Sequence, residues 1–437
     1  MFDDSILPSR KASSIYPLGV ADSAAPARLK VIISAYACEP GKGSEPGTGW
    51  EWVEHLAVHH DLVVVTRANQ RVGIEKRVAS LSENRPRFVY VDAPGWVLWL
   101  KRRLPGSEVW HYALWQRLAE RAISRLVAAE KFDLVQHLSW ATFRFHAAIW
   151  GHGLPSIWGP VAGAELCPWA LLPWKRPGVF VAEFTRNMAT LFHSSRLAPL
   201  RSRARRSTIT MAVSPDMQCA FARLGVSAKL LPTLAVHLPA RYERESSAGR
   251  PLRLLFVGRL MYWKGVELAL RALHRSQTDA RYDFIGIGPF TQQAQQLTRE
   301  LGLESRVSFR GRVAYDGMMQ AYREYDALLF PSIHDSGGNV VVEAMSHGMP
   351  VICLDRGGPG LFVLQEKTGI KVPDGSLEQV LDGLADAIRK YDGNRELVAI
   401  HGAAARQHVE AEFTWPYRAK QMDAIYREAV AIFSETK

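Results

Sequence analysis

Two carboxylates with a glycine-rich turn between them are the residues of this sequence best suited to chemistry. Asp335, Gly337, Gly338 and Asn339 occupy the turn, and Glu343 follows Asp335 by eight positions in a run with helical spacing. A strand-to-helix turn of this kind directs backbone N–H groups and the positive end of a helix at one point, which suits an anion. The carboxylates add acceptors for hydroxyl groups, so the pattern favours a nucleotide sugar. The simpler alternative makes Asp335 an N-cap and Glu343 a solvated helix residue.

Short apolar runs must hold this turn in place. Leu328–Pro331 and Val351–Leu354 are typical of buried parallel strands, and Gly348 with Pro350 ends the helix between them. An earlier predicted strand, Leu252–Gly258, is likewise followed by a loop and a predicted helix.

Two cations follow that earlier strand. Arg259 and Lys264 precede the predicted helix Val266–His274. At such a helix start, an arginine that donates two parallel hydrogen bonds and a lysine that acts as a point charge can bind a diphosphate. The alternative is a solvated surface turn.

The first ordered strand, Leu29–Ala35, also leads into glycines and a helix predicted over Glu51–His59. Strands and helices alternate from there, as in a doubly wound nucleotide-binding fold. The glycine spacing around Gly47 and Gly49 matches neither GxGxxG nor a Walker loop, which excludes a dinucleotide or ATP site of those types. His137 ends the predicted strand Asp133–His137, where ligands gather in such sheets, although a lone histidine is more often structural.

Composition sets wider limits. The chain has 437 residues, 47% of them hydrophobic and 22% charged, so we expect two globular domains. The net charge of +11 favours an anionic partner, which could be nucleotide, lipid or nucleic acid. Four cysteines without a CxxC pair predict neither a metal centre nor a disulfide framework, and indicate a reducing cytoplasm. Residues 1–28 lack the pattern of a secretory signal, and no apolar run is long enough to span a membrane.

Two stretches interleave aromatic and basic side chains. They are Trp96–Leu104 and Trp169–Arg206, the second with Trp174, Lys175, Arg176, Arg201, Arg203, Arg205 and Arg206. Such composition favours attachment to an anionic membrane surface. Core packing with a solvated basic face is the alternative, and nucleic-acid binding is not expected because no known motif accompanies the charge.

Several strings together resemble glycosyltransferase family 4, in a bacterial exopolysaccharide-type branch. The signature of an acid, seven residues and a Glu, within Pro-Ser, a glycine turn, Glu-Ala-Met and Gly-x-Pro, is matched by Pro331, Ser332, Asp335, Gly338, Glu343, Ala344, Met345, Gly348 and Pro350. GRLMYWKG around Lys264 and SAYACEPGKGSEPGTGW around Gly47 match further family strings. The departure is Asp335, where the family usually has the longer Glu.

The resemblance implies an α/β protein of the GT-B fold, with two Rossmann-like domains facing a cleft and a C-terminal helix crossing back to the first domain. The expected parts are a mobile leader (1–28), an acceptor domain (29–240), a linker (241–250), a donor domain (251–411) and the final helix (412–437).

Residue roles also follow from the resemblance. The expected catalytic residues are Arg259, Lys264, Asp335, Glu343 and His137. The expected donor-binding residues are Gly47, Gly49, Gly258, Gly288, Arg312, Gly337, Gly338 and Asn339. Glu45 and Glu165 are expected at the acceptor, with no metal and no cofactor.

The implied function is a retaining, metal-independent hexosyltransferase. It would move a sugar from a nucleotide diphosphate sugar to a saccharide or polyprenyl-linked acceptor in cell-surface polysaccharide synthesis, in the cytoplasm on the inner face of the membrane. A GT-B-type epimerase, an inverting transferase and a catalytically inactive sugar-nucleotide or membrane-binding module remain alternatives. A dehydrogenase is excluded because no strand is followed by a GxGxxG.

Overall fold

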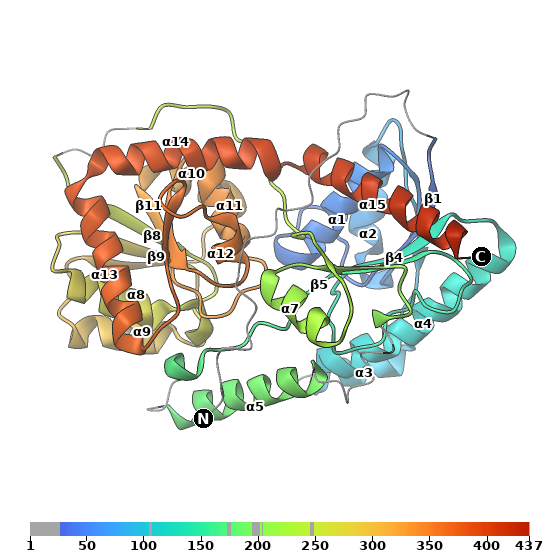
Figure 1. Ribbon diagram of the computed structural model, residues 1–437, viewed down its shortest axis with the longest axis horizontal. Helices are drawn as coiled ribbons and strands as arrows, with labels where there is room; N and C mark the ends of the chain where they lie inside the picture. Colours follow the sequence, from blue (N-terminus) through green and yellow to red (C-terminus); the bar gives the residue numbers. More distant parts are fainter. Residues whose placement is uncertain are drawn as a thin grey trace. The chain divides into compact units, whose positions relative to one another are not determined.

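The computed structural model describes residues 27–104, 107–172, 176–194, 202, 204–244 and 249–436, without the side chains of residues 102, 107, 315 and 316. The chain forms two compact units (Figure 1). The first comprises Met1–Ala164, Leu191–Thr233 and Trp415–Lys437, and the second comprises Glu165–Thr190 and Leu234–Thr414.

The first unit is built on a parallel sheet with the order β3-β2-β1-β4-β5-β6-β7. Its strands are β1 Lys30–Ala35, β2 Asp61–Thr66, β3 Arg87–Tyr90, β4 Leu134–Ser139, β5 Ser156–Val161, β6 Ile209–Ala212 and β7 Lys229–Leu230. Ile32 pairs with Val63 on β2 and with Val135 on β4, so both hydrogen-bonding edges of β1 are paired with neighbouring strands. The chain order reverses between β1 and β4, which makes their carboxyl ends a topological switch point.

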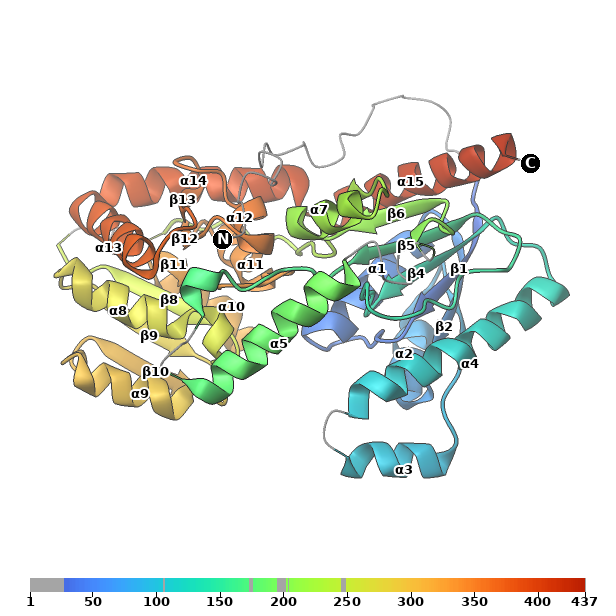
Figure 2. The same cartoon turned by 60° about the horizontal axis from the view of Figure 1, so that its bottom comes forward.

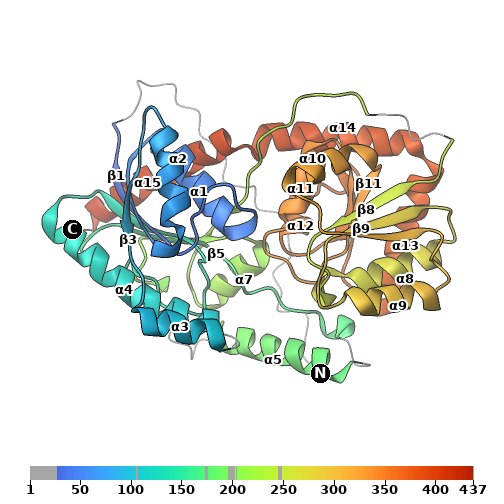
Figure 3. The same cartoon turned by 180° about the vertical axis from the view of Figure 1, so that it is seen from behind.

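The helices of the first unit lie around this sheet (Figure 3). They are α1 Ser44–Ala57, α2 Arg71–Ser80, α3 Gly95–Arg103, α4 Ser107–Ala129, α7 Pro215–Arg223 and α15 Trp415–Glu435, with the 3₁₀ turn η2 Ala68–Gln70. The C-terminal helix α15 lies against α1, where the rings of Trp52 and Trp415 meet edge to face at 5.7 Å. The predicted return of the last helix to the first domain is therefore confirmed.

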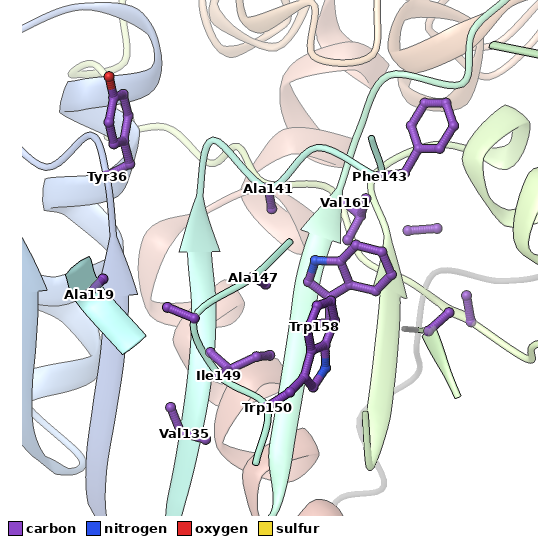
Figure 4. Packing of buried hydrophobic residues seen from close by; sticks show 14 of the residues in the cluster. Tyr36, Ala119, Val135, Ala141, Phe143, Ala147, Ile149, Trp150, Trp158 and Val161 are labelled. Carbon is purple, nitrogen blue, oxygen red and sulfur yellow. The ribbon is translucent and has the colours of Figure 1, made fainter. Parts of the chain in front are cut away.

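Large aromatic side chains fill the first unit's core (Figure 4). Trp150 and Trp158 are buried with ring centroids 5.3 Å apart, and Trp158 also contacts Phe221 at 5.6 Å. Edge-to-face pairs of this size add to the free energy gained from their buried area, by about 1 kcal/mol each. The core therefore fixes β5 against the chain that follows β4 and against α7.

The second unit has a parallel sheet with the order β10-β9-β8-β11-β12-β13. Its strands are β8 Arg253–Val257, β9 Arg281–Ile285, β10 Val307–Gly311, β11 Ala327–Phe330, β12 Val351–Leu354 and β13 Gly369–Val372. Its helices are α5 Pro177–His193 (its last residues fall to the first unit), α8 Val266–Ser276, α9 Thr291–Glu300, α10 Tyr315–Glu324, α11 Asn339–Ser346, α12 Gly357–Phe362, α13 Leu377–Gly393 and α14 Arg395–Glu412, with the turns η3 Trp169–Leu171 and η4 Tyr262–Lys264. Leu255 pairs with Asp283 on β9 and with Leu328 on β11, so the switch point lies between β8 and β11.

Two boundaries differ from the sequence prediction. The segment Glu165–Thr190 belongs to the second unit, whereas the predicted first domain ran from 29 to 240. The predicted linker 241–250 also belongs to the second unit: Tyr242 Oη and Arg244 Nη1 donate to the His347 carbonyl at 3.0 and 2.9 Å. Non-local polar contacts decide both cases, and these are not visible in local composition. Residues 245–248 of that segment and residues 1–26 of the predicted leader lie outside the described residues.

Candidate functional site

The two loops at the switch point of the second sheet carry six of the predicted site residues: Gly258, Arg259, Lys264, Asp335, Gly337 and Gly338. We name them the β8 loop (258–264) and the β11 loop (331–338). Ile333 N and Ser332 Oγ donate to the Trp263 carbonyl at 2.7 and 3.0 Å, which fastens one loop to the other. Gly265 has φ +73°, and a Cβ there would lie 1.9 Å from the Pro331 carbonyl oxygen. Only glycine permits this close approach.

Lys264 and Asp335 form an ion pair across these loops. Lys264 Nζ also lies 5.2 Å from the ring centroid of Phe330, and Asp335 Oδ1 accepts from Gly337 N at 3.3 Å. Asp335 therefore shapes the turn and holds the cation. It is not the N-cap of α11, because that position is Gly338 and no side chain caps it.

The glycine-rich turn is held from behind by the start of α12. Gly358 N donates to the Asp335 carbonyl at 2.8 Å, and a Cβ on Gly358 would lie 2.4 Å from the Gly337 carbonyl oxygen. Gly338 has φ +69°, after which Asn339 begins α11. A helix cannot pair its own first backbone N–H groups. In α11 these groups come shortly after Asp335 along the chain, at the same turn that holds the Lys264–Asp335 pair.

Glu343 lies in the middle of α11 and is largely covered. Its Oε2 accepts from Tyr322 Oη, on α10, at 2.8 Å. Burial raises the pKa of the Glu343 carboxyl above its ordinary value, and the Tyr322 hydrogen bond lowers it in part. Glu343 is therefore not the solvated helix residue of the simpler alternative. The Tyr322 ring lies 5.3 Å from His347, whose pKa burial and neighbouring arginines lower to about 4.

The remaining donor candidates lie on the same carboxyl edge of the second sheet. Arg259 follows Gly258, is exposed, and among the described residues has no hydrogen-bond or ion-pair partner. Gly288 follows β9, where its amide donates to Thr291 Oγ1 at 3.0 Å and a Cβ would lie 2.1 Å from the Leu260 carbonyl oxygen. Arg312 follows β10 and is exposed. The fold thus brings the second-unit donor candidates to one edge, though from four different strands.

Sequence reasoning missed a polar cluster behind the β11 loop. His334 Nε2 and Glu183 Oε2 are 2.9 Å apart, and the His334 ring stacks on Trp263 at 5.7 Å. Arg186 donates to Glu183 at 3.1 Å and to the Glu165 carbonyl at 2.7 Å. Glu165, the predicted acceptor residue, is buried within this group. The available signal was a Glu, an Arg and an Asn within a mostly apolar helical run.

His137 lies in the core of the first unit. Its ring is fully buried, with Nε2 2.9 Å from Tyr112 Oη and Nδ1 3.4 Å from Ser34 Oγ. Burial lowers its pKa to about 3, so the imidazole is neutral. The geometry gives His137 the structural role that a lone histidine usually has.

The glycines predicted near the donor phosphates lie in the first turns of α1, which begins at Ser44 and not at Glu51. A Cβ on Gly47 would lie 1.8 Å from the Lys42 carbonyl oxygen, and one on Gly49 would lie 2.1 Å from that of Ala37. Close packing against the backbone within the first unit therefore explains why both positions are glycine. Glu45 is exposed, with Oε2 3.5 Å from the Trp140 amide nitrogen.

The basic aromatic stretches are partly described. Trp96 and Trp99 are exposed on α3, where Arg103 stacks on Trp99 at 4.2 Å, and Arg205 and Arg206 are exposed. Trp174, Lys175, Arg201 and Arg203 lie outside the described residues. Across the described part of the chain, no helix is both long and apolar enough to cross a bilayer.

Comparison with known sequences places the likeness in the second unit. Residues 241–407 match the family model described as Glycosyl transferases group 1. A D-inositol 3-phosphate glycosyltransferase of Corynebacterium diphtheriae is 33% identical over 197 residues, which is 41% of this chain and 43% of that protein. The chain spans less than half the length of the curated relatives it matches.

Solved structures match more of the chain at lower identity. Sucrose-phosphate synthase from Thermosynechococcus elongatus superposes with a TM-score of 0.63 at 17% identity, over 92% of this chain and 100% of that one. Anabaena HepE in complex with UDP and glucose gives 0.57 at 17% identity, over 92% and 100%. These likenesses concern the fold, and the predicted α/β class with two Rossmann-like units, as in GT-B glycosyltransferases, is confirmed.

Proposed function

We propose that the protein is a retaining glycosyltransferase of the family 4 type that uses a nucleotide diphosphate sugar. The observation that carries the proposal is the Lys264–Asp335 pair at the switch point of the second sheet, beside the start of α11. Ligands of doubly wound sheets bind at such a point. The match of residues 241–407 to a glycosyltransferase family model supports the same reading.

In this proposal the second unit holds the donor. Lys264 has three N–H donors and gives only part of them to Asp335, so it can also bind a phosphate oxygen. Arg259 is exposed and pairs with no residue in the described part of the chain. Its guanidinium group can therefore donate two hydrogen bonds to the diphosphate. These cations and the N–H groups of α11 would stabilise the charge that grows on the leaving diphosphate. That is the task a metal ion performs in other sugar transferases, so we propose a metal-independent reaction.

The two carboxylates would recognise the rest of the donor. Asp335 would accept from hydroxyls of the transferred sugar and Glu343 from those of the ribose. The acceptor hydroxyl would attack the face from which the diphosphate leaves, and a donor phosphate oxygen would take its proton. We propose a hexose as the transferred sugar and a saccharide or polyprenyl-linked acceptor in cell-surface polysaccharide synthesis. We also propose cytoplasmic location with peripheral attachment to an anionic membrane surface.

Thermal-shift measurement with UDP, GDP and ADP sugars tests donor binding, because a ligand that binds only the folded state raises the Tm. Lys264→Ala should lose most of that shift. Lys390→Ala is the matched control, since Lys390 pairs with Glu366 on an exposed face of the same unit. Equal shifts in the two variants would overturn the diphosphate assignment. Proton NMR of the product then separates retention from inversion, and binding without turnover would indicate an inactive module.

A further inference from the structure

The Glu343 carboxylate on α11 has one oxygen that is held and one that is open. Oε2 accepts from Tyr322 Oη at 2.8 Å. No residue in the described part of the chain donates to Oε1, and this oxygen is not sealed from solvent, since Glu343 is partly exposed. Each oxygen of a carboxylate has two lone pairs that accept hydrogen bonds. Oε1 can therefore accept from two hydroxyl groups of a ligand at once.

The phenol that holds Oε2 is itself fixed. Tyr322 is fully buried on α10, and its ring lies 5.3 Å from the ring of His347, which follows α11. The helices α10 and α11 lie next to each other in the second unit (Figure 2). A close-packed side chain of this size keeps one rotamer, so its hydroxyl donates from one position. Oε2 thus has a rigid partner, which constrains the orientation of the whole carboxylate.

Arg244 ties the ends of these two helices together. Its Nη1 donates to the Tyr322 carbonyl at 3.1 Å and to the His347 carbonyl at 2.9 Å, and its Nη2 donates to the Tyr325 carbonyl. Tyr325 and His347 are the C-cap residues of α10 and α11. The last carbonyls of a helix lack partners within the helix and carry partial negative charge, which suits a guanidinium. One arginine therefore sets the distance between the two helix ends, and with it the position of Tyr322 relative to Glu343.

This arrangement costs stability unless a ligand completes it. Burial raises the pKa of the Glu343 carboxyl, and no cation among the described residues pairs with it. A carboxylate that leaves water for a single uncharged donor is poorly compensated. The two neighbouring hydroxyls of a ribose would supply the missing donors at Oε1. A carboxylate that is already held in place loses less side-chain freedom when it binds them.

We propose that Tyr322 is a positioning residue for ribose recognition: it fixes Oε2 of Glu343 so that Oε1 faces the ribose hydroxyls of the donor nucleotide. Arg244 serves the same end by holding α10 against α11. Tyr322 is fully buried and acts through Glu343, without touching the ligand. The inference rests on the proposed function, in which Glu343 accepts from the ribose. It adds how a single carboxylate comes to distinguish ribose from deoxyribose.

Calorimetry on the full chain tests this with UDP, GDP and ADP and with the 2′-deoxy and 3′-deoxy forms of each. The wild type should bind the ribose form roughly tenfold more tightly than at least one deoxy form, because a hydrogen bond to a charged acceptor contributes about that much. Tyr322→Phe removes only the hydroxyl. In this variant the ratio of the two Kd values should fall to about threefold or less, while the Kd of the deoxy form stays within about threefold of the wild type.

Tyr282→Phe is the matched control. Tyr282 lies on β9 of the same unit, is fully buried, and donates to the Leu329 carbonyl at 2.8 Å. The control thus loses the same atom and a hydrogen bond of the same length, but away from Glu343. It should keep the wild-type ratio of Kd values.

Glu343→Gln provides a second measurement. If Tyr322 acts through Glu343, adding Tyr322→Phe to Glu343→Gln should change the ratio of Kd values no further. An additive loss in the double variant would show that Tyr322 acts by another route, and would overturn the inference.

Three other results would also overturn it. Tyr322→Phe could keep the wild-type ratio, it could lose the ribose and deoxy forms equally, or the wild type could bind both forms equally. In each case the proposed function stands, because the wild type still binds a nucleoside diphosphate. A wild type that binds none of these nucleotides would instead refute the proposed function, and this inference with it.

Discussion

The contact between Lys264 and Asp335 allows the role of the lysine toward a ligand to be separated from its role in the fold. Their side chains are 22% and 13% exposed, between a surface pair and a buried one. Removing one partner costs up to about 1 kcal/mol in an exposed pair and about 3–5 kcal/mol in a buried one. We therefore expect Lys264→Met to lower the free energy of unfolding by roughly 1–3 kcal/mol, because it leaves the Asp335 carboxylate without its cation.

A double-mutant cycle with Asp335→Asn then isolates the ligand. The double variant should recover about 1–2 kcal/mol of stability, since neither side chain is left charged and unpaired. Its affinity for a nucleoside diphosphate should not recover. A lost charge-assisted hydrogen bond of about 1.5–3 kcal/mol corresponds to roughly a 10- to 150-fold rise in Kd.

Calorimetry with UDP, GDP and ADP and urea unfolding provide the two measurements. Diphosphates without sugar are used because Asp335 is assigned to the sugar, so Asp335→Asn alone should bind them at least as well as the wild type. If the double variant binds the diphosphate within twofold of the wild type, Lys264 is only a counter-ion for Asp335, and the donor-site reasoning is wrong.

Three further predictions follow from burial and backbone geometry. Burial raises the pKa of the Glu343 carboxyl, so the folded state loses stability as the pH rises above the ordinary pKa of a glutamate. Glu343→Gln should therefore raise the Tm at pH 7.5, and the gain should shrink as the pH falls toward about 4. The same variant should weaken nucleotide binding in calorimetry. Burial lowers the pKa of His137 to about 3, so as the pH falls the unfolded state takes up a proton before the folded state does, and stability decreases from about pH 6.5 to 3. His137→Asn should reduce this loss of stability, measured by urea unfolding at several pH values. Turnover per folded molecule should stay within threefold of the wild type. Gly265→Ala should lower the free energy of unfolding by more than about 2 kcal/mol, because its Cβ would overlap the Pro331 carbonyl at φ +73°, whereas Gly393→Ala, in open space at the end of α13, should be neutral or stabilising.

The strands could be predicted from sequence because β-branched and apolar runs specify them locally. Val351–Leu354 is observed as predicted, and the first strand differs by one residue, Lys30–Ala35 against Leu29–Ala35. The start of α1 was predicted seven residues late, at Glu51 and not Ser44. Glycines and a proline there suggest a loop, but α1 approaches the backbone of the preceding loop so closely that a side chain on Gly49 would not fit. That reason exists only once the chain has folded.

The assignment of Glu165–Thr190 to the second unit was also beyond sequence reasoning. An apolar helical run such as α5 suggests a buried helix of the domain in which it occurs. Its place is decided by polar side chains whose partners are distant in sequence, as in the contact between Glu183 and His334, which are 151 positions apart. Hydrophobic periodicity reports which residues avoid water, but not which polar residues find partners, so the burial of Glu183, Asn187 and Thr190 on α5 could not be predicted.

The two carboxylates show the same limit within the site. Spacing predicted Asp335 in the turn before a helix and Glu343 on that helix, and the fold has them there, but their environments differ. Asp335 faces a cation from the neighbouring strand's loop, and the adjacency of β8 and β11 makes that contact an expected consequence of the fold. Glu343 accepts from a phenol on α10, no cation pairs with it in the part of the chain that the structure describes, and burial raises its pKa. A carboxylate kept at a cost in stability, with one uncharged donor, is more readily explained by a ligand hydroxyl than by packing, and this is why Glu343→Gln should stabilise the fold and weaken donor binding together.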